Sequence, residues 1–410
     1  MKRYVILGGG VASVHCILGI REIDKEGEIT LVSSERHAPY CRPLISYYLE
    51  GRTTPEKMAY RGEAFYEEMG VHLLLGKTAT NVDKEKQEVT LDDGEILPYE
   101  SLCLATGSSP FVPPMAGLDS VPVKFTFMTL DDALALEAAL TPSARVFIIG
   151  AGLIGLKCAE GLYGRVGSIT VCDLAGRVLS SILDDECAGM VQHTLEEKGL
   201  SFLLSDSVES FEGQKAFLKS GKEVDFDILV LAVGVRANTS LLKEAGGEVG
   251  RGILVDKHMQ TSLPSIYAAG DCAEGFDLSL GAGRVLAILP NASLQGHTAG
   301  INMAGGNEVF CKGIPMNSIG FFGLHAMTAG TYEGECFEEK GEGFIRRLYY
   351  KDDLLKGFIL LGRQERAGIY TSLIREKTPL SSINFDLMKK AATTAAFSMD
   401  ERGRKFGGVV

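Results

Sequence analysis

Residues 145–155 read RVFIIGAGLIG, and this stretch decides the fold. An apolar strand runs into glycines spaced Gly-x-Gly-x-x-Gly, at Gly150, Gly152 and Gly155. The first glycine permits a tight turn, the second lets the backbone approach a pyrophosphate, and the third lets helix and strand pack closely. The stretch therefore predicts a dinucleotide-binding βαβ unit, with the phosphates at the start of a helix over 155–164.

The next predicted strand, 168–173, ends in Asp173, 23 residues after Gly150. An Asp at this point accepts hydrogen bonds from the adenosine ribose hydroxyls and repels a 2′-phosphate, so we expect NADH rather than NADPH. Arg177 lies four residues on and is able to soften that preference or to form a helix-start salt bridge. The residues assigned to the nicotinamide nucleotide are Gly150, Gly152, Leu153, Ile154, Asp173 and Gly234.

The same plan stands at the N-terminus, where strand 3–8 runs into Gly8-Gly9-Gly10-Val11-Ala12-Ser13 and a helix over about 11–24. Ser13 occupies the third position, where glycine or alanine is usual and a small residue is needed for packing. Glu35 follows the second strand, 28–33, and is the acid expected to bind ribose hydroxyls. Ser33 lies nearer the usual strand-end position, so the two residues can share that contact.

Two dinucleotide loops in one chain predict an electron relay between a flavin and a nicotinamide, because two nicotinamides have no useful exchange between them. We expect a first domain over 1–112 and 238–308 that binds FAD. A second domain over 113–237, inserted into the first, is expected to bind the nicotinamide nucleotide. Segment 108–117, which is rich in Pro, Ser and Gly, and segment 233–238, which follows a strand, are the expected crossings between the two domains.

The chain changes character after about residue 310. Alternating stretches at 317–323, 344–350 and 355–361 predict a small antiparallel sheet. A helix is expected over 364–376, in a C-terminal domain that covers 309–410. The predicted fold class is therefore α/β, with two Rossmann-like doubly wound domains followed by a small α+β domain.

Composition narrows the classes of function. The chain has 410 residues, 45% of them apolar and 23% charged, and no apolar run reaches the ~18 residues of a membrane helix. Nine cysteines without a CxxC argue against a disulfide framework, a zinc site or an iron–sulfur centre. They favour a reducing cytoplasm. The net charge of −12 disfavours nonspecific binding to nucleic acid or to anionic membranes.

Two further motifs are Leu104-Ala105-Thr106-Gly107-Ser108-Ser109-Pro110 and Ile266-Tyr267-Ala268-Ala269-Gly270-Asp271-Cys272. With both loops, they make residues 3–305 resemble the pyridine-nucleotide-disulfide oxidoreductase superfamily in its FAD/NAD two-domain form. The resemblance implies that the Ala-Thr-Gly segment turns between domains beside FAD. It also implies that Asp271 binds a ribityl hydroxyl of the flavin. Asp271 also fits a helix N-cap, and it can serve both roles.

Within the superfamily, the chain resembles the branch with the FAD domains of NADH-dependent nitrite reductases and the NADH:rubredoxin and ferredoxin reductases. Residues 40–46, YCRPLIS, and 290–296, PNASLQG, carry this likeness. It implies that Arg42 faces the FAD pyrophosphate, that Pro43 lies near the isoalloxazine ring, and that a helix start at 290–296 faces the flavin. The residues assigned to FAD are Gly8, Gly10, Val11, Ala12, Glu35, Arg42, Pro43, Ala105, Thr106, Gly107, Gly270, Asp271 and Gln295.

No acid–base residue is assigned as catalytic, because the cofactor carries the chemistry of hydride transfer. The CxxxxC pair of disulfide reductases is absent, and Pro43 stands where a single-cysteine branch has its redox thiol. Cys41 is the remaining candidate for a redox thiol; its alternative is a small packing residue. His297 is a candidate for contact with the ring or substrate. Lys157 replaces the Glu of many relatives, and it can pair with a phosphate or with Glu160.

The resemblance leaves three functions open. The preferred one passes electrons from NADH through FAD to a redox-protein acceptor, namely a rubredoxin, a ferredoxin or a partner subunit. The second reduces a small molecule directly: oxygen, peroxide, or a CoA disulfide or persulfide. The third is a flavoprotein that senses NADH without turnover. Relatives use the C-terminal domain to help cover the flavin and to contact a partner or a second copy, so a homodimer is one expected arrangement.

Overall fold

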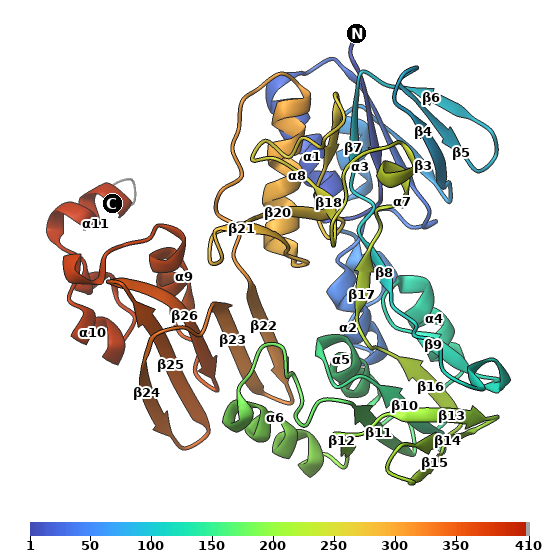
Figure 1. The fold of residues 1–410 in the computed structure, drawn as a ribbon, viewed down its shortest axis with the longest axis vertical. Helices are drawn as coiled ribbons and strands as arrows, with labels where there is room; N and C mark the ends of the chain where they lie inside the picture. The colour runs from blue at the N-terminus through green and yellow to red at the C-terminus, as the bar shows by residue number, and fades with distance from the viewer. Residues whose placement is uncertain (407–410) are drawn as a thin grey trace. The chain divides into compact units, whose positions relative to one another are not determined.

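The computed structural model describes residues 1–406, with side chains up to Gly403 (Figure 1). The chain divides into two compact units, one of Met1–Val178 with Gly199–Cys311 and the other of Leu179–Lys198 with Lys312–Val410. None of the helices in the described part of the chain is long and apolar enough to cross a membrane.

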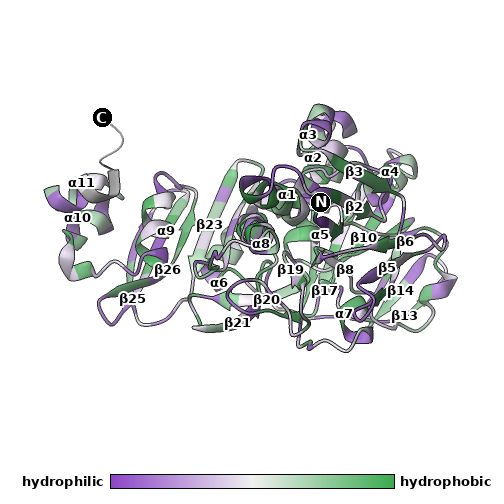
Figure 2. Ribbon diagram, turned by 90° about the horizontal axis from the view of Figure 1, so that it is seen from above, coloured by the Kyte–Doolittle hydropathy of each residue, from purple (hydrophilic) through white to green (hydrophobic). Residues whose placement is uncertain are grey.

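A five-stranded parallel sheet forms the first half of the larger unit, in the order β19-β7-β1-β2-β3. Strands β1 and β7 are buried along almost their whole length, as is typical of parallel strands that are covered on both faces. In Figure 2 the labelled strands β2, β3 and β10 are predominantly hydrophobic. The strands of this sheet are β1 Arg3–Leu7, β2 Glu28–Ser33, β3 Val71–Leu75, β7 Ser101–Leu104 and β19 Ile266–Ala268.

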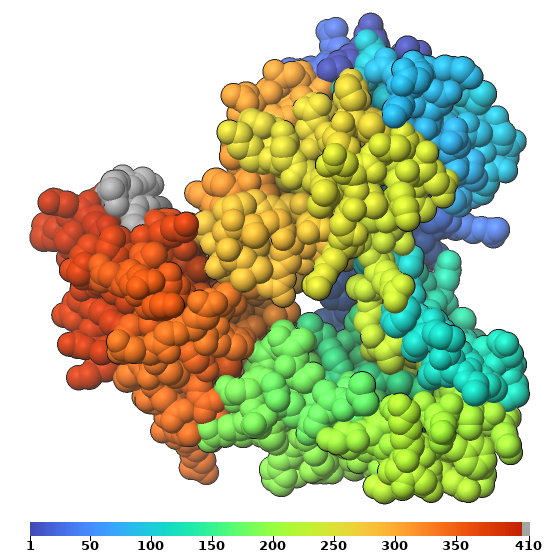
Figure 3. All heavy atoms as spheres, viewed as in Figure 1, coloured from blue at the N-terminus to red at the C-terminus, as the bar shows by residue number. Residues whose placement is uncertain are grey.

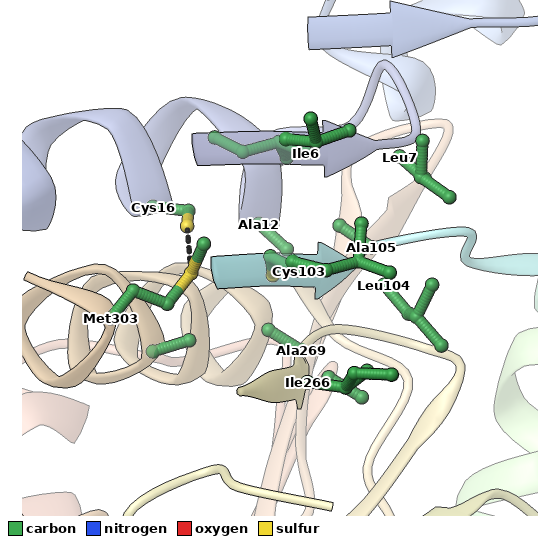
Figure 4. Packing of buried hydrophobic residues seen from close by; sticks show 14 of the residues in the cluster. Ile6, Leu7, Ala12, Cys16, Cys103, Leu104, Ala105, Ile266, Ala269 and Met303 are labelled. Carbon is green, nitrogen blue, oxygen red and sulfur yellow. Dashed lines mark hydrogen bonds between the residues drawn. The ribbon is translucent and has the colours of Figure 1, made fainter. Parts of the chain in front are cut away.

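Helices α1 (Val11–Ile23) and α8 (Leu289–Met303) pack side by side against this sheet, backbone to backbone. A Cβ atom on Gly296 would lie 2.1 Å from the Ala12 carbonyl oxygen, so only glycine permits this approach. Figure 4 shows the core beneath, where the sulfur atoms of Cys16 and Met303 lie 3.6 Å apart. This packing fixes the start of α1, and with it the first glycine loop.

A second five-stranded parallel sheet follows, in the order β12-β11-β10-β16-β9. Buried aromatic rings fill one side of it, with Phe147 and Phe226 stacked at 5.8 Å between centroids. The strands are β9 Lys124–Thr126, β10 Arg145–Ile149, β11 Ser168–Asp173, β12 Ser201–Leu204 and β16 Ile228–Leu231. The helices of the larger unit that lie between these strands in sequence are α4 Leu130–Ala138 and α5 Leu153–Leu162.

The two predicted crossings pair with each other as an antiparallel ribbon of β8 (Ser108–Pro110) and β17 (Val235–Ala237). The backbone N–H of Phe111 extends the ribbon by donating to Gly234 O at 2.9 Å. Figure 3 shows the yellow-green atoms of the second crossing at the surface between the parts built on the two sheets. The chain therefore passes between the two sheets through one two-stranded link.

Short elements complete the larger unit, in three small sheets and three short helices. The strands are β4 Ala79–Asp83, β5 Glu88–Leu91, β6 Ile96–Pro98, β13 Val208–Glu212, β14 Lys215–Leu218, β15 Glu223–Asp225, β18 Ile253–Leu254, β20 Ala273–Asp277 and β21 Ala282–Val285. The helices are α2 Ile45–Leu49, α3 Glu63–Glu68 and α7 Ser240–Glu244. Because β20 follows Asp271 directly, the predicted helix N-cap role of that residue is wrong.

The smaller unit is an antiparallel sheet in the order β22-β23-β26-β25-β24, with helix α9 packed on β26. The predicted strands correspond to β22, β25 and β26, whereas β23 and β24 were not anticipated. Arg347 on β25 forms ion pairs with Asp184 and Glu186, which attach α6 to this sheet, and with Glu338 on the neighbouring strand β24. The elements are β22 Met316–Phe321, β23 Leu324–Gly330, β24 Glu335–Gly341, β25 Phe344–Lys351, β26 Leu354–Leu361, α6 Asp185–Glu197, α9 Ala367–Arg375, α10 Phe385–Lys390 and α11 Met399–Phe406.

The predicted fold class is confirmed by two parallel sheets with helices and a separate antiparallel sheet with helices. The larger compact unit contains both parallel sheets, so the division at 112/113, 237/238 and 308/309 stays a prediction.

Candidate functional site

The first glycine loop has the geometry of a phosphate cradle. Gly8 adopts φ +124°, and a Cβ there would lie 2.0 Å from Ala105 O, so the turn requires glycine. Gly10 is the reverse case, because no atom lies within 4 Å of where its Cβ would stand. Helix α1 begins at Val11 with no side chain capping it, so no side chain satisfies the N–H groups of its first turn.

Ser13, the departure from the usual glycine or alanine, has a defined place in this loop. The residue is fully buried, and its hydroxyl donates a hydrogen bond to Gly8 O. The serine therefore satisfies its own buried hydroxyl and braces the turn from inside α1. Serine in place of the usual glycine or alanine is therefore compatible with the geometry of the first glycine loop.

The second glycine loop repeats this geometry. Gly150 adopts φ +116°, and a Cβ there would lie 2.2 Å from Ala232 O. A Cβ on Gly155 would lie 1.9 Å from Gly150 O, whereas the position of a Cβ on Gly152 is open. Helix α5 begins at Leu153, again without a capping side chain.

Asp173 lies at the mouth of the second loop. One carboxylate oxygen accepts from the Ala151 N–H at 2.6 Å, and the other accepts from the Ala175 N–H at 2.7 Å. Gly234, on the neighbouring crossing, adopts φ +111° with no atom within 4 Å of its Cβ position. The structure thus leaves open space at Gly152 and Gly234 and fixes the acid against the loop.

Both loops meet the physical requirements of a bound dinucleotide. A pyrophosphate needs backbone without side chains in its way and N–H groups at the positive end of a helix. The Gly10 and Gly152 positions supply the space, and the uncapped starts of α1 and α5 supply the donors. The residues present therefore fit two nucleotide cofactors.

Asp271 lies beside the first loop in a largely enclosed position. Burial raises the pKa of its carboxyl, against the opposing effects of a hydrogen bond from Ser108 and the charge of Arg42. The Ser108 hydroxyl donates to it at 3.3 Å. An enclosed carboxylate with one long hydrogen bond has unused acceptor capacity, which suits the hydroxyls of a sugar alcohol.

Gly270 connects Asp271 to the first loop. It adopts φ +82°, and its Cβ position lies 3.0 Å from the Cβ of Ala12. Its N–H donates at 2.8 Å to the side-chain oxygen of Gln295, which is fully buried in α8. Of the residues assigned to FAD, Gln295 therefore holds the Gly270 backbone, while Gly8, Ala12, Ala105, Gly270 and Asp271 lie together.

The adjoining turn is held by hydrogen bonds in both directions. The Thr106 hydroxyl donates to Asn238 O, and the Asn238 side-chain amide donates back to Thr106 O, both at 2.9 Å. Gly107 adopts φ +65° with its Cβ position open. Asn238 was missed in the sequence, and its only signal there is its place at the end of the second crossing.

Glu35, the predicted ribose acid, is engaged with protein groups. Its two carboxylate oxygens accept from the Tyr40 hydroxyl and the Arg42 guanidinium, each at 2.6 Å. Arg42 also donates to Met128 O at 2.9 Å. Pro43 is exposed beside Arg42. The hydroxyl of Tyr40 was not predicted to take part.

The three other candidates lie in different surroundings. Cys41 is half-buried, and burial raises the pKa of its thiol, so the thiolate is disfavoured. His297 pairs with Glu22 of α1 at 2.8 Å and with Glu308 at 3.1 Å, so both ring nitrogens have carboxylate partners within the protein. Lys157 pairs with Glu160, one of its two predicted partners. No cluster of three potential metal ligands occurs among the described residues.

Comparison with known proteins agrees with this geometry. Residues 2–296 match the family described as pyridine nucleotide-disulphide oxidoreductase. The epsilon subunit of NADH-dependent phenylglyoxylate dehydrogenase from Aromatoleum evansii is 32% identical over 395 residues, which are 93% of either chain. The rubredoxin-NAD(+) reductase of Pseudomonas putida is 32% identical over 307 residues, 73% of this chain and 80% of that protein.

Other relatives are longer. The nitrite reductase [NAD(P)H] of Bacillus subtilis (strain 168) is 32% identical over 420 residues, which are 98% of this chain and 51% of that protein. The chain thus spans about half the length of that relative. The crystal structure of a covalent putidaredoxin reductase–putidaredoxin complex matches with a TM-score of 0.88 and 24% identity, covering 100% of this chain and 99% of that chain. This likeness shows the fold.

Proposed function

The chain belongs to the pyridine nucleotide-disulphide oxidoreductase family, and we propose that it passes electrons from NADH, through FAD, to a redox-protein acceptor or partner subunit. As a member of this family it is an FAD-dependent NAD(P)H oxidoreductase. The identity of the acceptor and the preference for NADH are the parts proposed here.

The observation that carries the proposal is the pair of equivalent glycine loops, one on each parallel sheet. In each loop one glycine is required by a turn, while Gly10 or Gly152 leaves its Cβ position open beside an uncapped helix start. Two such cradles fit two dinucleotides. FAD, when bound, accepts hydride from a reduced nicotinamide and releases the electrons singly or in pairs.

The residues around the first loop are proposed to hold FAD. The α1 N-terminus binds its pyrophosphate, and Asp271 accepts from the ribityl hydroxyls. Arg42 supplies positive charge near the pyrophosphate. The start of α8 has no side-chain cap, so its positive end is available to negative charge on the flavin ring. No further acid or base of the chain is needed for hydride transfer.

NADH is proposed as the donor because Asp173 ends β11 beside the second loop. Its carboxylate is fixed by the N–H groups of Ala151 and Ala175. A fixed negative charge accepts from ribose hydroxyls and repels a 2′-phosphate.

A protein acceptor is preferred to a thiol substrate for two reasons. The raised pKa of Cys41 disfavours the thiolate that disulfide reduction requires. The Aromatoleum relative is a subunit of a larger NADH-dependent dehydrogenase, and the Pseudomonas relative is named for rubredoxin. Both names fit electrons that leave toward another redox protein.

The test is an anaerobic acceptor screen on the purified protein, which we expect to be yellow and to release FAD on denaturation. NADH should bleach the flavin rapidly, and NADPH should do so with lower affinity. Turnover with rubredoxin, ferredoxin or one-electron dyes, without disulfide reduction, is the expected result. A protein that cannot be loaded with flavin, or a flavin that NADH does not bleach, contradicts the proposal.

A further inference from the structure

Tyr40 connects the first glycine-loop domain to the second through its hydroxyl. The side chain is buried, and its hydroxyl donates to Glu35 at 2.6 Å while accepting the backbone N–H of Leu130 at 2.8 Å. Leu130 is the first residue of α4, which follows edge strand β9 of the second sheet. The N–H groups of a helix's first turn lack partners within the helix, so Tyr40 satisfies one of them from the other domain.

The position of this hydroxyl is set firmly from the first domain. Tyr40 forms a backbone bridge with Ala59, and Cys41 N–H donates to Met58 O at 2.8 Å. Both ends of the phenol are therefore held, by the backbone bridge at one end and by Glu35 at the other. A rigid donor–acceptor of this kind transmits the position of one domain to the other.

Arg42 makes a second connection to the same segment. Its guanidinium donates to Met128 O at 2.9 Å and to Glu35 at 2.6 Å. Burial alone would lower its pKa, but Tyr40 and Glu35 outweigh burial, so the pKa is raised and the guanidinium stays charged. Glu35 thus supports both side chains that reach 128–130. We name these contacts the Tyr40 tether: Tyr40 to Leu130 and Arg42 to Met128, both supported by Glu35.

A second set of contacts reaches the same domain from α2. Arg165 donates to Leu49 O at 2.5 Å and to Glu137 at 3.0 Å, and the Tyr48 hydroxyl donates to Glu137. The ion pairs His37–Asp131 and Lys157–Glu50 and the close packing of α2 on Gly161 of α5 also join the two domains, and the chain itself crosses in the two-stranded ribbon of β8 and β17. A two-stranded ribbon can twist, so the contacts between the two domains, the Tyr40 tether among them, fix the angle between the two sheets.

We propose that Tyr40 is a positioning residue that holds the second-loop domain at the angle required for hydride transfer, with Glu35 and Arg42 as its supports. This inference rests on the function proposed above, because the distance between the two cofactors decides the rate. A shift of about 1 Å at a reacting centre can lower a rate on the order of 100-fold. The hydroxyl of Tyr40 bonds Glu35 and Leu130, which lie outside both glycine loops.

The first arm of the test measures the tether without any turnover. In the FAD-loaded protein, Tyr40→Phe removes only the hydroxyl, and we expect hydrogen–deuterium exchange across 128–132 to accelerate at least tenfold. Exchange in β1 should stay unchanged. The matched control is Tyr4→Phe, which also removes a buried tyrosine hydroxyl hydrogen-bonded to a carboxylate, that of Asp24 at 2.8 Å. Unchanged exchange over 128–132 in Tyr40→Phe would overturn the tether.

The second arm measures hydride transfer in stopped flow under anaerobic conditions. At saturating NADH, Tyr40→Phe should bleach its flavin at least tenfold more slowly. Its FAD content and its Kd for NAD⁺ should stay within twofold of the wild type. Deuterium at C4 of the nicotinamide should slow the variant more than the wild type, because hydride transfer limits it more fully. A purely structural role would lower FAD content or thermal stability and leave the rate per bound flavin unchanged.

Three further outcomes bear on the positioning role of Tyr40. Equal slowing in Tyr4→Phe would show a general loss of stability and overturn the positioning role. A Tyr40→Phe protein that fails to fold would also overturn the positioning role, because the hydroxyl would then be required by the fold itself. If NADH fails to bleach the wild-type flavin, the proposed function and the positioning role both fail, while exchange over 128–132 still decides whether the tether exists.

Discussion

The carboxylate of Asp173 accepts a 2.6 Å hydrogen bond from the backbone N–H of Ala151, in the turn of the second glycine loop. The end of β11 and the turn after β10 therefore hold each other before any nucleotide binds. The other carboxylate oxygen of Asp173 accepts a hydrogen bond from the Ala175 N–H. The acid is fixed in position, and lone pairs remain on each oxygen for a ribose hydroxyl.

Replacing Asp173 with Ala should weaken NADH binding far more than FAD binding. The variant loses a charged acceptor for the ribose and the brace on Ala151, and hydrogen bonds to charged groups contribute about 1.5–3 kcal/mol each. We expect Kd for NADH to rise roughly 10- to 100-fold with FAD content unchanged. Titration by flavin fluorescence measures both. Asp225→Ala, an exposed carboxylate of the same domain, is the control, and equal loss of both cofactors would mean that the loops are assigned to the wrong nucleotides.

Gly10→Ala and Gly152→Ala should separate binding from folding. Each Cβ enters open space at negative φ, −109° and −82°, so the fold tolerates the methyl group. The methyl group occupies the place proposed for a pyrophosphate. We expect Gly10→Ala to lose FAD and Gly152→Ala to lose NADH affinity, with unfolding temperatures of the flavin-free proteins within about 2 °C of the parent. Gly155→Ala should instead lower that temperature clearly, because its Cβ would lie 1.9 Å from Gly150 O.

Replacing Asp271 with Asn should stabilise the flavin-free fold and weaken FAD binding. Burial raises the pKa of Asp271 above its ordinary value of 3.8, so folding favours the protonated form. The corresponding stability is present below pH 3.8 and is lost as pH rises through the raised pKa. An Asn side chain does not ionise, so the variant does not lose this stability as pH rises. Its flavin-free form should therefore unfold at a higher temperature at pH 7, and its unfolding temperature should vary less with pH. Its FAD affinity should fall. Calorimetry from pH 4 to 8 checks the sign, and identical pH curves for the two proteins would contradict it.

Cys41→Ser should leave electron transfer intact. Burial raises the pKa of the Cys41 thiol, so at neutral pH it is a protonated and poor nucleophile. We expect NADH-driven acceptor reduction within about twofold of the parent, and slow alkylation of Cys41 by iodoacetamide at pH 7. Peptide mass spectrometry follows the alkylation. Loss of acceptor reduction in the serine variant would give Cys41 the redox role that the proposal denies it.

The glycine loops were predictable because their requirements are local. A turn at Gly8 or Gly150 requires positive φ and close backbone contact, and a short run of consecutive residues indicates both requirements. The same holds for Asp173 at the end of its strand. The Tyr40 tether was not predictable, because the tyrosine and Leu130 lie 90 positions apart. Nothing near Tyr40 in sequence distinguishes a bridging hydroxyl from that of an ordinary core tyrosine.

Two errors have a different cause. Gly270-Asp271 reads equally well as a helix start or as a turn between strands, and pairing of β20 with β18 and β21 decides for the turn. Strand β24, residues ECFEEKG, lies at the edge of its sheet, where charged residues are common and alternation is weak. In both cases the partner strands, not the segment itself, determine the structure.

The ribbon of β8 and β17 has a consequence for how such a chain can be rebuilt. Phe111 N–H and Gly234 O meet at 2.9 Å, so the entry and exit of the 111–234 segment lie side by side. A segment with adjoining ends can be excised, closed with a few glycines, or exchanged for a homologous cassette without stretching the host. Donor specificity would then be transplantable as a single piece, provided that the replacement also offers a helix start for Tyr40 and the acidic partners that Arg347 has at the start of α6.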